Sequence, residues 1–263
     1  MRIALGIEYA GTPFCGWQSQ PSGCGVQDAV EAALAKFAGM SEERVAVTCA
    51  GRTDTGVHAR GQVVHFDTSI EREGAAWVRG TNTYLPADIR VLWAQRVDAA
   101  FHARFSARGR AYRYLLLNDG VAPALLAGRV GWFHAPLDLE RMQVAARILL
   151  GEHDFSAFRA AECQAKSPVK RLRQAELCRH GAIIDFSFAA DAFLHHMVRN
   201  IVGALVYVGA GRHTPEEFAE IFESRDRTRA APTFSPDGLY LWQIEYDDRF
   251  AIPQPRNRHP LLA

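Results

Sequence analysis

The chain has 263 residues, of which 48% are hydrophobic and 22% are charged, so a packed core is expected in one large domain or in two of ordinary size. No stretch approaches the roughly eighteen consecutive apolar residues of a membrane helix, and Met1–Gly6 leads into a strand-like pattern instead of a signal peptide. These features argue against a membrane protein and predict a folded protein of the cytoplasm.

The first hundred residues predict strands and helices in alternation. Apolar residues recur at helical spacing from Val26 onward, and this pattern ends near Gly39. The expected elements are strands at 3–9, 45–49, 62–66 and 89–97 and helices at 26–37 and 75–82. This order is typical of a ferredoxin-like half-domain.

The second part of the chain carries clear helix-start signals. Asp138 is the expected N-cap of a helix that runs to Leu150 and is closed by Gly151. Thr214 opens a capping box with Pro215 at the first helical position. The other expected elements are strands at 111–117, 174–178, 182–188 and 239–246 and a helix at 193–208.

The simplest architecture is therefore α+β with two halves. We expect an N-terminal half over residues 1–105, a C-terminal half over 106–250 and a proline-rich tail over 251–263 without regular structure. A groove is expected between the two halves, beside their join near residues 103–110.

The net charge of only +1 hides two basic segments. Of the 30 basic residues 27 are arginine, a residue suited to phosphate contacts and to stacking on bases. The runs FHARFSARGRAYR (101–113) and KSPVKRLR (166–173) contain no acid, and the first interleaves arginine with aromatic residues. Such runs are typical of RNA-binding surfaces, although solvated loops have a similar composition.

Cysteines and histidines do not form a recognisable ligand pattern. The five cysteines are odd in number and contain no C-x-x-C pair, which argues against a disulfide framework and a zinc site and predicts small buried side chains. His195 and His196 are adjacent in an expected helix, where they would point in different directions. We predict no metal.

Asp54-Thr55-Gly56 spells the motif of an aspartic protease. Such an enzyme needs a second carboxylate that shares a proton with the first, but the chain has no second D-T-G. A plain turn is the structural alternative. Gly51 and Gly56 would let a ligand approach the backbone, and Arg52 places a cation two residues from the acid, so a catalytic role also fits.

Arg199 lies in an expected helix that is apolar over most of its circumference. It shares the remaining polar stripe with His196 and Asn200. An arginine on a buried helix requires a carboxylate or a phosphate as its partner. Asp54 is the candidate partner, because an enclosed carboxylate equally needs a cation to stay ionised.

The segment AGRTDTGVHARGQVVHF, from Ala50 to Phe66, resembles the active-site segment of the tRNA pseudouridine synthase family TruA. The resemblance continues through ordered matches along most of the chain: GWQ from Gly16, FHARFSA from Phe101, LLGEHDFSAF from Leu149, FLHHMVRNIVGAL from Phe193 and GLYL from Gly238. Ala10, Thr55 and Tyr84 depart from the usual family residues.

The resemblance implies an isomerase that converts uridine to pseudouridine at positions 38, 39 and 40 of the tRNA anticodon arm, without a cofactor. Asp54 would be the nucleophile or the proton-abstracting base, and Arg199 would keep it ionised. The substrate-binding residues would be Arg52, His58, Tyr112 and Leu241. A catalytically silent RNA-binding protein of the same fold is the alternative.

The family fold implied by the resemblance consists of two ferredoxin-like halves. They form one continuous, mainly antiparallel sheet with helices on one side and a central cleft. The resemblance also implies a homodimer with tRNA lying across both subunits.

Overall fold

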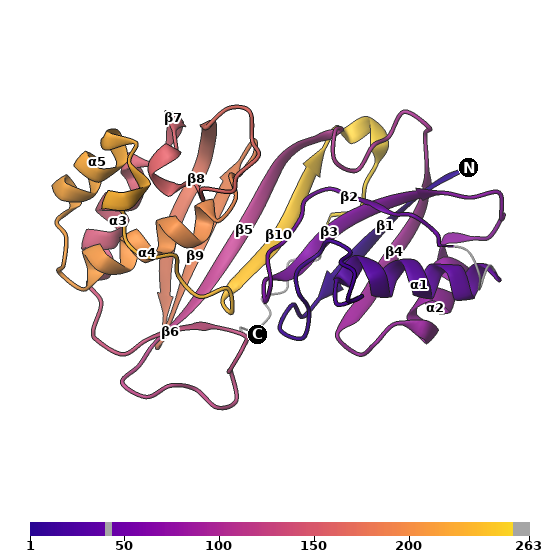
Figure 1. Ribbon diagram of the computed structural model, residues 1–263, viewed down its shortest axis with the longest axis horizontal. Coiled ribbons are helices and arrows are strands. Elements are labelled where there is room, and N and C mark those ends of the chain that lie inside the picture. Colours follow the sequence, from indigo (N-terminus) through magenta and orange to yellow (C-terminus); the bar gives the residue numbers. More distant parts are fainter. Residues whose placement is uncertain (40–43, 255–263) are drawn as a thin grey trace. The chain divides into compact units, whose positions relative to one another are not determined.

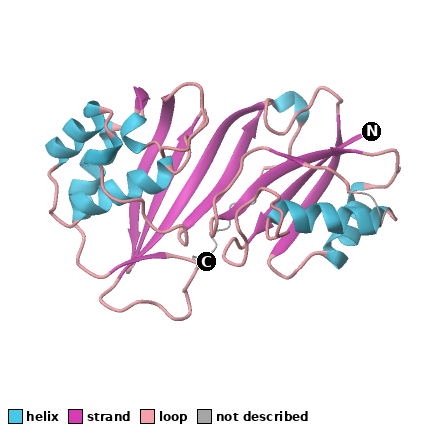
Figure 2. Cartoon of the chain, viewed as in Figure 1, coloured by secondary structure: helices cyan, strands magenta, loops and turns pink. Residues whose placement is uncertain are grey.

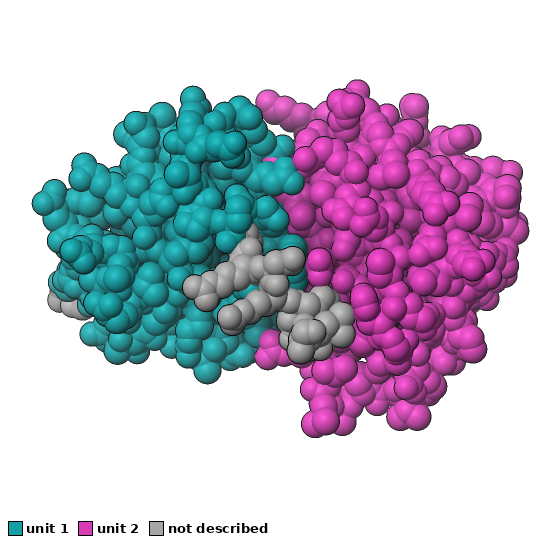
Figure 3. Space-filling view, turned by 180° about the vertical axis from the view of Figure 1, so that it is seen from behind, with its two compact units in different colours: residues 1–108, 241–263 teal, residues 109–240 magenta. Residues whose placement is uncertain are grey.

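The computed structural model describes residues 1–39 and 44–254 (Figures 1 and 2). In this part of the chain, five α-helices and ten strands form a mixed α+β fold whose strands are mainly antiparallel. The expected α+β class is therefore confirmed. The chain divides into two compact units, Met1–Arg108 with Leu241–Ala263 and Gly109–Tyr240, which we call unit 1 and unit 2 (Figure 3).

Unit 1 contains an antiparallel arrangement with β1 between β4 and β3. Helices α1 and α2 lie on one face of these strands (Figure 1). The bounds are β1 (Arg2–Tyr9), α1 (Val26–Ala38), β2 (Thr48–Cys49), β3 (His58–Asp67), α2 (Gly74–Tyr84) and β4 (Ile89–Val97). The short β2 pairs with β3, so the Asp54 segment is the connection between two paired strands.

Unit 2 contains the antiparallel order β5-β9-β8-β7, with β6 running parallel to β5. Its helices lie on one face of these strands (Figure 1). The bounds are β5 (Ala107–Asn118), β6 (Gly131–Phe133), α3 (Leu139–Ile148), β7 (Gly151–Asp154), β8 (Val169–His180), β9 (Ile183–Ala190), α4 (Met197–Gly209) and α5 (Pro215–Ser224).

The last strand, β10 (Leu239–Tyr246), begins in unit 2 and ends in unit 1. Short 3-10 turns lie at Ser156–Phe158, Arg227–Arg229 and Asp248–Phe250. Residues 251–254 have no regular structure, while the rest of the expected tail lies outside the described residues. The compact units do not test the expected domain bounds, so 1–105, 106–250 and 251–263 stay a prediction.

Helix ends follow the expected capping chemistry. Gly39, with φ +75°, ends α1 in the left-handed conformation that favours glycine. Asp138 accepts a hydrogen bond from the backbone N–H of Arg141 at the start of α3. Thr214 and Glu217 form the expected capping box of α5.

Three expectations about the elements were wrong. The strand expected over 45–49 is reduced to Thr48–Cys49, the residues that pair with β3. The helix expected to run to Leu150 ends at Ile148. The helix expected from Phe193 begins at Met197, because His196 has φ +59° and a left-handed residue cannot continue an α-helix.

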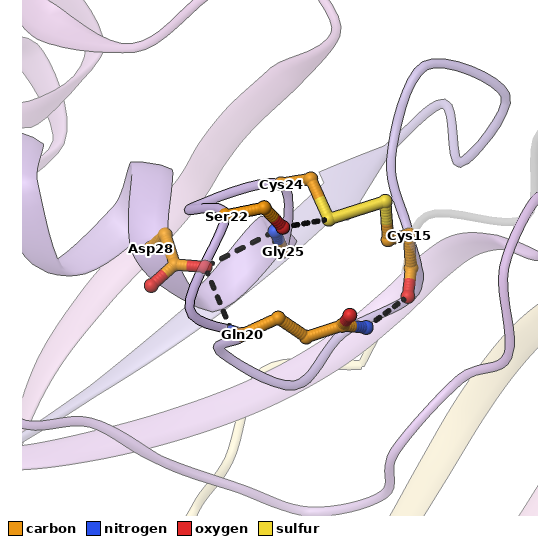
Figure 4. Close-up of a disulfide and its surroundings, with 6 residues drawn as sticks. All are labelled: Cys15, Gln20, Ser22, Cys24, Gly25 and Asp28. Atoms are coloured by element: carbon orange, nitrogen blue, oxygen red, sulfur yellow. Dashed lines mark hydrogen bonds between the residues drawn. A yellow bond between two sulfur atoms is a disulfide. The ribbon is translucent and has the colours of Figure 1, made fainter.

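Cys15 and Cys24 form a disulfide, which contradicts the expectation that the cysteines pack singly as small apolar residues (Figure 4). The loop between them folds back on itself, so that the N–H of Cys15 donates to the carbonyl oxygen of Cys24 at 3.0 Å. Their Cα atoms are 5.4 Å apart, within the usual range for a disulfide. Of the free cysteines, Cys163 is buried as expected, but Cys178 is exposed.

None of the helices in the described residues combines the length and the apolar character that crossing a bilayer requires.

Candidate active site

Asp54 lies on a tight turn between β2 and β3. The N–H of Val57 donates to the carbonyl oxygen of Asp54 at 3.1 Å, and Gly56 has φ +78°, as the third residue of a type II turn requires. Asp54 itself is half-buried, while Arg52 is exposed. The turn thus holds a carboxylate at the surface of unit 1 with a cation two residues away.

The end of β1 and the loop that follows it form hydrogen bonds with the residue before this turn. The N–H of Trp17 donates to the carbonyl oxygen of Thr53 at 2.9 Å, and the Thr53 hydroxyl shares a hydrogen bond of 2.8 Å with the hydroxyl of Tyr9. Gly16 has φ +93°, and a Cβ atom there would lie 2.8 Å from the Thr53 carbonyl oxygen. The close approach of the two loops therefore requires glycine at position 16.

His58 is fully buried at the start of β3. Its Nδ1 accepts a hydrogen bond of 3.0 Å from the N–H of Gly11. A Cβ atom at Gly11 would lie 2.0 Å from the carbonyl oxygen of Val57, so this loop also passes directly against the turn. His58 therefore joins the end of the turn to the loop that follows β1.

The same segment is also fixed before the turn. The side-chain amide of Gln62, itself buried, donates to the carbonyl oxygen of Gly51 at 2.6 Å. The N–H of Ala50 donates to the carbonyl oxygen of Val63 at 2.8 Å. Hydrogen bonds to the backbone thus restrain the chain before Arg52 and after Asp54.

The thiol of Cys49, five residues before Asp54, lies near two arginines. Burial raises the pKa of its thiol to about 11, while the positive charges of Arg52 and Arg104 act in the opposite direction. Both guanidinium groups therefore lie close enough to the same thiol to affect it. Two arginines of unit 1 thus lie near the segment that leads into the turn.

Tyr112 and Arg199 belong to unit 2. Tyr112, on β5, is half-buried and makes an edge-to-face contact with Phe193, whose ring centroid is 4.9 Å away. Arg199, on α4, is half-buried, and its Nε donates to the carbonyl oxygen of Phe234 at 2.8 Å. This hydrogen bond fixes the base of the guanidinium group against the segment that precedes β10.

The predicted site residues are divided between the units. Arg52, Asp54 and His58 lie together on the segment that enters β3, and Leu241 lies fully buried in β10 of the same unit. The expected pairing of Asp54 with Arg199 joins residues of different units, and it stays a prediction.

His195 and His196 lie in the turn before α4 and not in a helix, so the expectation that they point in different directions was wrong. Their ring centroids are 4.0 Å apart. His196, with its positive φ, is the N-cap residue directly before α4.

A cavity of about 420 Å³ lies elsewhere in unit 1, at the N-terminal end of α2. Trp77 and charged residues of both signs, including Arg72, Glu73 and Arg96, line it. None of the six predicted site residues is among the lining residues. We therefore place the candidate site at the Asp54 turn, where the sequence motif and the supporting hydrogen bonds coincide.

The supporting residues of the turn were missed from the sequence. Tyr9 and Gly11 gave no separate signal, because their roles depend on how the loop after β1 folds back. Gly16 and Trp17 were visible only as part of the GWQ match. A glycine followed by an aromatic residue in a loop was the one available sign of a close backbone approach.

Comparison with known proteins defines the class of this site. The model of the tRNA pseudouridine synthase family matches residues 6–106 and 145–247, and the first of these segments contains the whole Asp54 turn. The chain therefore belongs to the tRNA pseudouridine synthase family.

The similarity extends to individual relatives over nearly their full length. The chain is 60% identical to tRNA pseudouridine synthase A of Thiobacillus denitrificans over 260 residues, which cover 99% of each chain. It is 60% identical to the protein of that name from Methylobacillus flagellatus, with 96% of each chain covered. Against the Dechloromonas aromatica protein of the same name the identity is 59%, with 98% of this chain and 97% of the relative covered.

Proposed function

We propose that this protein isomerises uridine to pseudouridine in tRNA, and that its targets are positions 38, 39 and 40 of the anticodon arm. The observation that carries the proposal is the 60% identity, over 99% of both chains, to a protein named tRNA pseudouridine synthase A. The Asp54 turn supports it, because this turn presents one carboxylate on a backbone that is fixed on both sides.

The reaction moves one bond of the nucleoside. The bond between the ribose anomeric carbon and uracil N1 breaks, the base turns while it stays bound, and a new bond forms to C5. The proton leaves C5 and N1 gains one, so the conversion is a balanced isomerisation. Asp54 serves as the nucleophile or as the base that starts it, and both roles require an ionised carboxylate.

Arg199 keeps Asp54 ionised in this proposal. An opposite charge close to a carboxylate favours its charged form, and the hydrogen bond to Phe234 would restrain the guanidinium group for that purpose. Tyr112 packs on the target uracil through its half-exposed ring.

Arg52 is suited to a part in base flipping. A uridine inside a stem has to leave the stack before Asp54 can reach it. Arg52 is exposed two residues before Asp54 and would occupy the gap or hold the displaced backbone.

His58 and Leu241 act as positioning residues in this account. Both are fully buried, and His58 binds the backbone of Gly11 through Nδ1. They would shape the substrate site through the backbone that they support. We further propose that the protein acts in the cytoplasm as a homodimer, with tRNA in contact with both subunits.

A catalytically silent RNA-binding protein is the weaker alternative. The relatives over the full chain are named as synthases, and Asp54, Tyr112 and Arg199 are all retained.

Pseudouridine mapping tests the function. tRNA from cells with and without the protein would be compared nucleotide by nucleotide. We expect pseudouridine at positions 38, 39 and 40 to disappear in the absence of the protein and to return with a plasmid copy. Unchanged pseudouridine at all three positions would contradict the proposal, while loss at other tRNA positions would correct the target sites alone.

A further inference from the structure

Phe105 is held in an unusual position for a large aromatic side chain. It is 77% exposed, but one face of its ring stacks on His102, with centroids 4.3 Å apart and an angle of 30° between the planes. A single exposed apolar residue needs no explanation by itself. The stacking on His102 distinguishes Phe105, because it fixes an aromatic ring that is still largely exposed.

The turn that carries Phe105 is restrained by its own hydrogen bonds. Nδ1 of His102 accepts from the N–H groups of both Arg104 and Phe105 at 3.2 Å. The N–H of His102 donates to Oγ of Ser106, and the N–H of Ser106 donates back to the carbonyl oxygen of His102. The Phe105 ring is therefore ordered before any partner arrives, which lowers the entropy cost of stacking.

The turn is also anchored to the core of unit 1. The N–H of Ala103 donates to Nδ1 of His65 on β3 at 3.1 Å, and the Tyr246 hydroxyl donates to the carbonyl oxygen of Ala103 at 2.6 Å. The rings of His65 and His102 have centroids 4.9 Å apart. His65, His102 and Phe105 thus form one column of rings from β3 to the surface, which we call the Phe105 column.

One arginine lies against the exposed end of the column. The Arg104 guanidinium carbon lies 5.9 Å from the centroid of the Phe105 ring. Arg104 and Arg52 both act electrostatically on the thiol of Cys49. Arg104 therefore lies near both the Phe105 ring and the segment that leads to the Asp54 turn.

We propose that the Phe105 column is a stacking platform for an unpaired nucleobase of the tRNA, with Arg104 beside the phosphate of that nucleotide. This inference rests on the proposed action on tRNA. A largely exposed aromatic ring with an arginine close over it suits a nucleotide, because every base has a π-face and every nucleotide carries a negative charge. The same ring would bind bases of any sequence, which suits an enzyme that acts at several adjacent positions.

Variants of Phe105 test the stacking. Phe105→Ala is expected to raise the Kd and KM for tRNA about tenfold, with kcat at saturating tRNA changed less than about twofold. Phe105→Trp retains a π-face and is expected to bind as tightly as wild type. Phe105→Leu retains an apolar side chain without a π-face and is expected to resemble Phe105→Ala. Val144→Ala, which truncates an exposed apolar side chain of unit 2, is the control and is expected to match wild type.

An abasic scan identifies the occupant. Anticodon stem-loop RNAs that lack one base at a time would be titrated with wild type and Phe105→Ala. One abasic position is expected to weaken wild-type binding about tenfold and to leave the binding of Phe105→Ala unchanged. The inference is overturned if wild type forms pseudouridine while Phe105→Ala binds tRNA normally, or if Phe105→Leu binds as well as Phe105→Trp. If wild type forms no pseudouridine at all, the proposed function fails together with the inference.

Discussion

Gly16 lets the loop after β1 pass close to the turn that carries Asp54. A side chain there would meet the carbonyl oxygen of Thr53 at 2.8 Å and the carbonyl carbon of Asp54 at 3.1 Å. The affected atoms belong to the backbone of the turn, so the turn itself would have to move.

The variants Gly16→Ala and Gly23→Ala separate two effects of an added Cβ atom. One is the backbone strain of a positive φ, and the other is displacement of the Asp54 turn. Both glycines have positive φ, but a Cβ atom at Gly23 meets nothing within 4 Å. Gly23→Ala is expected to cost about 1 kcal/mol of unfolding free energy with unchanged activity. Gly16→Ala is expected to cost more and to lower kcat at least about tenfold, because small displacements of reacting groups are expensive. Urea unfolding and single-turnover rates measure these effects, and equal activity of the two variants would contradict the role of Gly16.

His65 makes stability depend on pH in a defined window. Burial, assisted by the positive charges of Arg2 and His102, lowers its pKa to about 4. In the unfolded chain, His65 has the ordinary histidine pKa of about 6.5. Between this pH and about 4 it is protonated in the unfolded chain but neutral in the native state. The stability that neutral His65 contributes is therefore complete above about pH 6.5 and is lost as the pH falls toward about 4.

The variant His65→Asn tests this dependence, because asparagine keeps an acceptor for the N–H of Ala103 without titrating. Urea unfolding between about pH 7 and about pH 4.5 is expected to show a smaller loss of stability for the variant than for wild type. Parallel losses in the two proteins would show that other groups cause the pH dependence.

At the scale of elements, the loop between β1 and α1 combines a disulfide with the support of the turn. Cys15 and Cys24 are joined, and the adjacent Gly16 and Trp17 accept hydrogen bonds from the first residues of α1. The disulfide closes a short loop, whose entropy it removes from the unfolded chain.

Replacement of both cysteines by serine is expected to lower the free energy of unfolding by about 2–3 kcal/mol. Treatment of wild type with a dithiol reductant should give a similar loss, and the reductant should leave the serine variant unchanged. Cys178→Ser, at an exposed free cysteine, is the control. Equal stability of wild type with and without reductant would contradict a structural role for the disulfide.

Long elements were predictable from the sequence because their patterns repeat. The strands at 89–97 and 239–246 have the expected bounds. The short β6 and β7 were missed, since three or four residues carry too little periodicity. The start of α4 depends on the backbone of His196, which the apolar pattern cannot report.

The candidate site was predictable only in part, because some of its residues are placed by tertiary contacts that leave no local sequence pattern. The motif predicted a turn at Asp54-Thr55-Gly56, and the structure has a turn there, with Arg52 two residues before it. The supports from Gly11 and Gly16 follow from tertiary contacts and have no local pattern. The Cys15–Cys24 bond was missed because its spacing resembles no known framework.

For the whole molecule, the proposed mechanism requires Asp54 of unit 1 and Arg199 of unit 2 to act as a pair. The double-mutant cycle of Asp54→Asn and Arg199→Gln measures their coupling in unfolding free energy. A coupling of about 1 kcal/mol or more is expected for a charged pair in contact. The control cycle replaces Arg199→Gln by Arg113→Gln, whose ion pair is with Asp185, and its losses should add. Additive losses in the first cycle would contradict the pairing.

Tritium release from tRNA labelled at uridine C5 tests the catalytic role of Asp54. Wild type is expected to release label from its target uridines, and Asp54→Asn is expected to be slower by more than about a thousandfold while it still binds tRNA. Thr55→Ala, which changes the exposed neighbour to the usual family residue, is the control and should keep wild-type activity. Release by Asp54→Asn at the wild-type rate would contradict the assignment of Asp54 as the catalytic carboxylate.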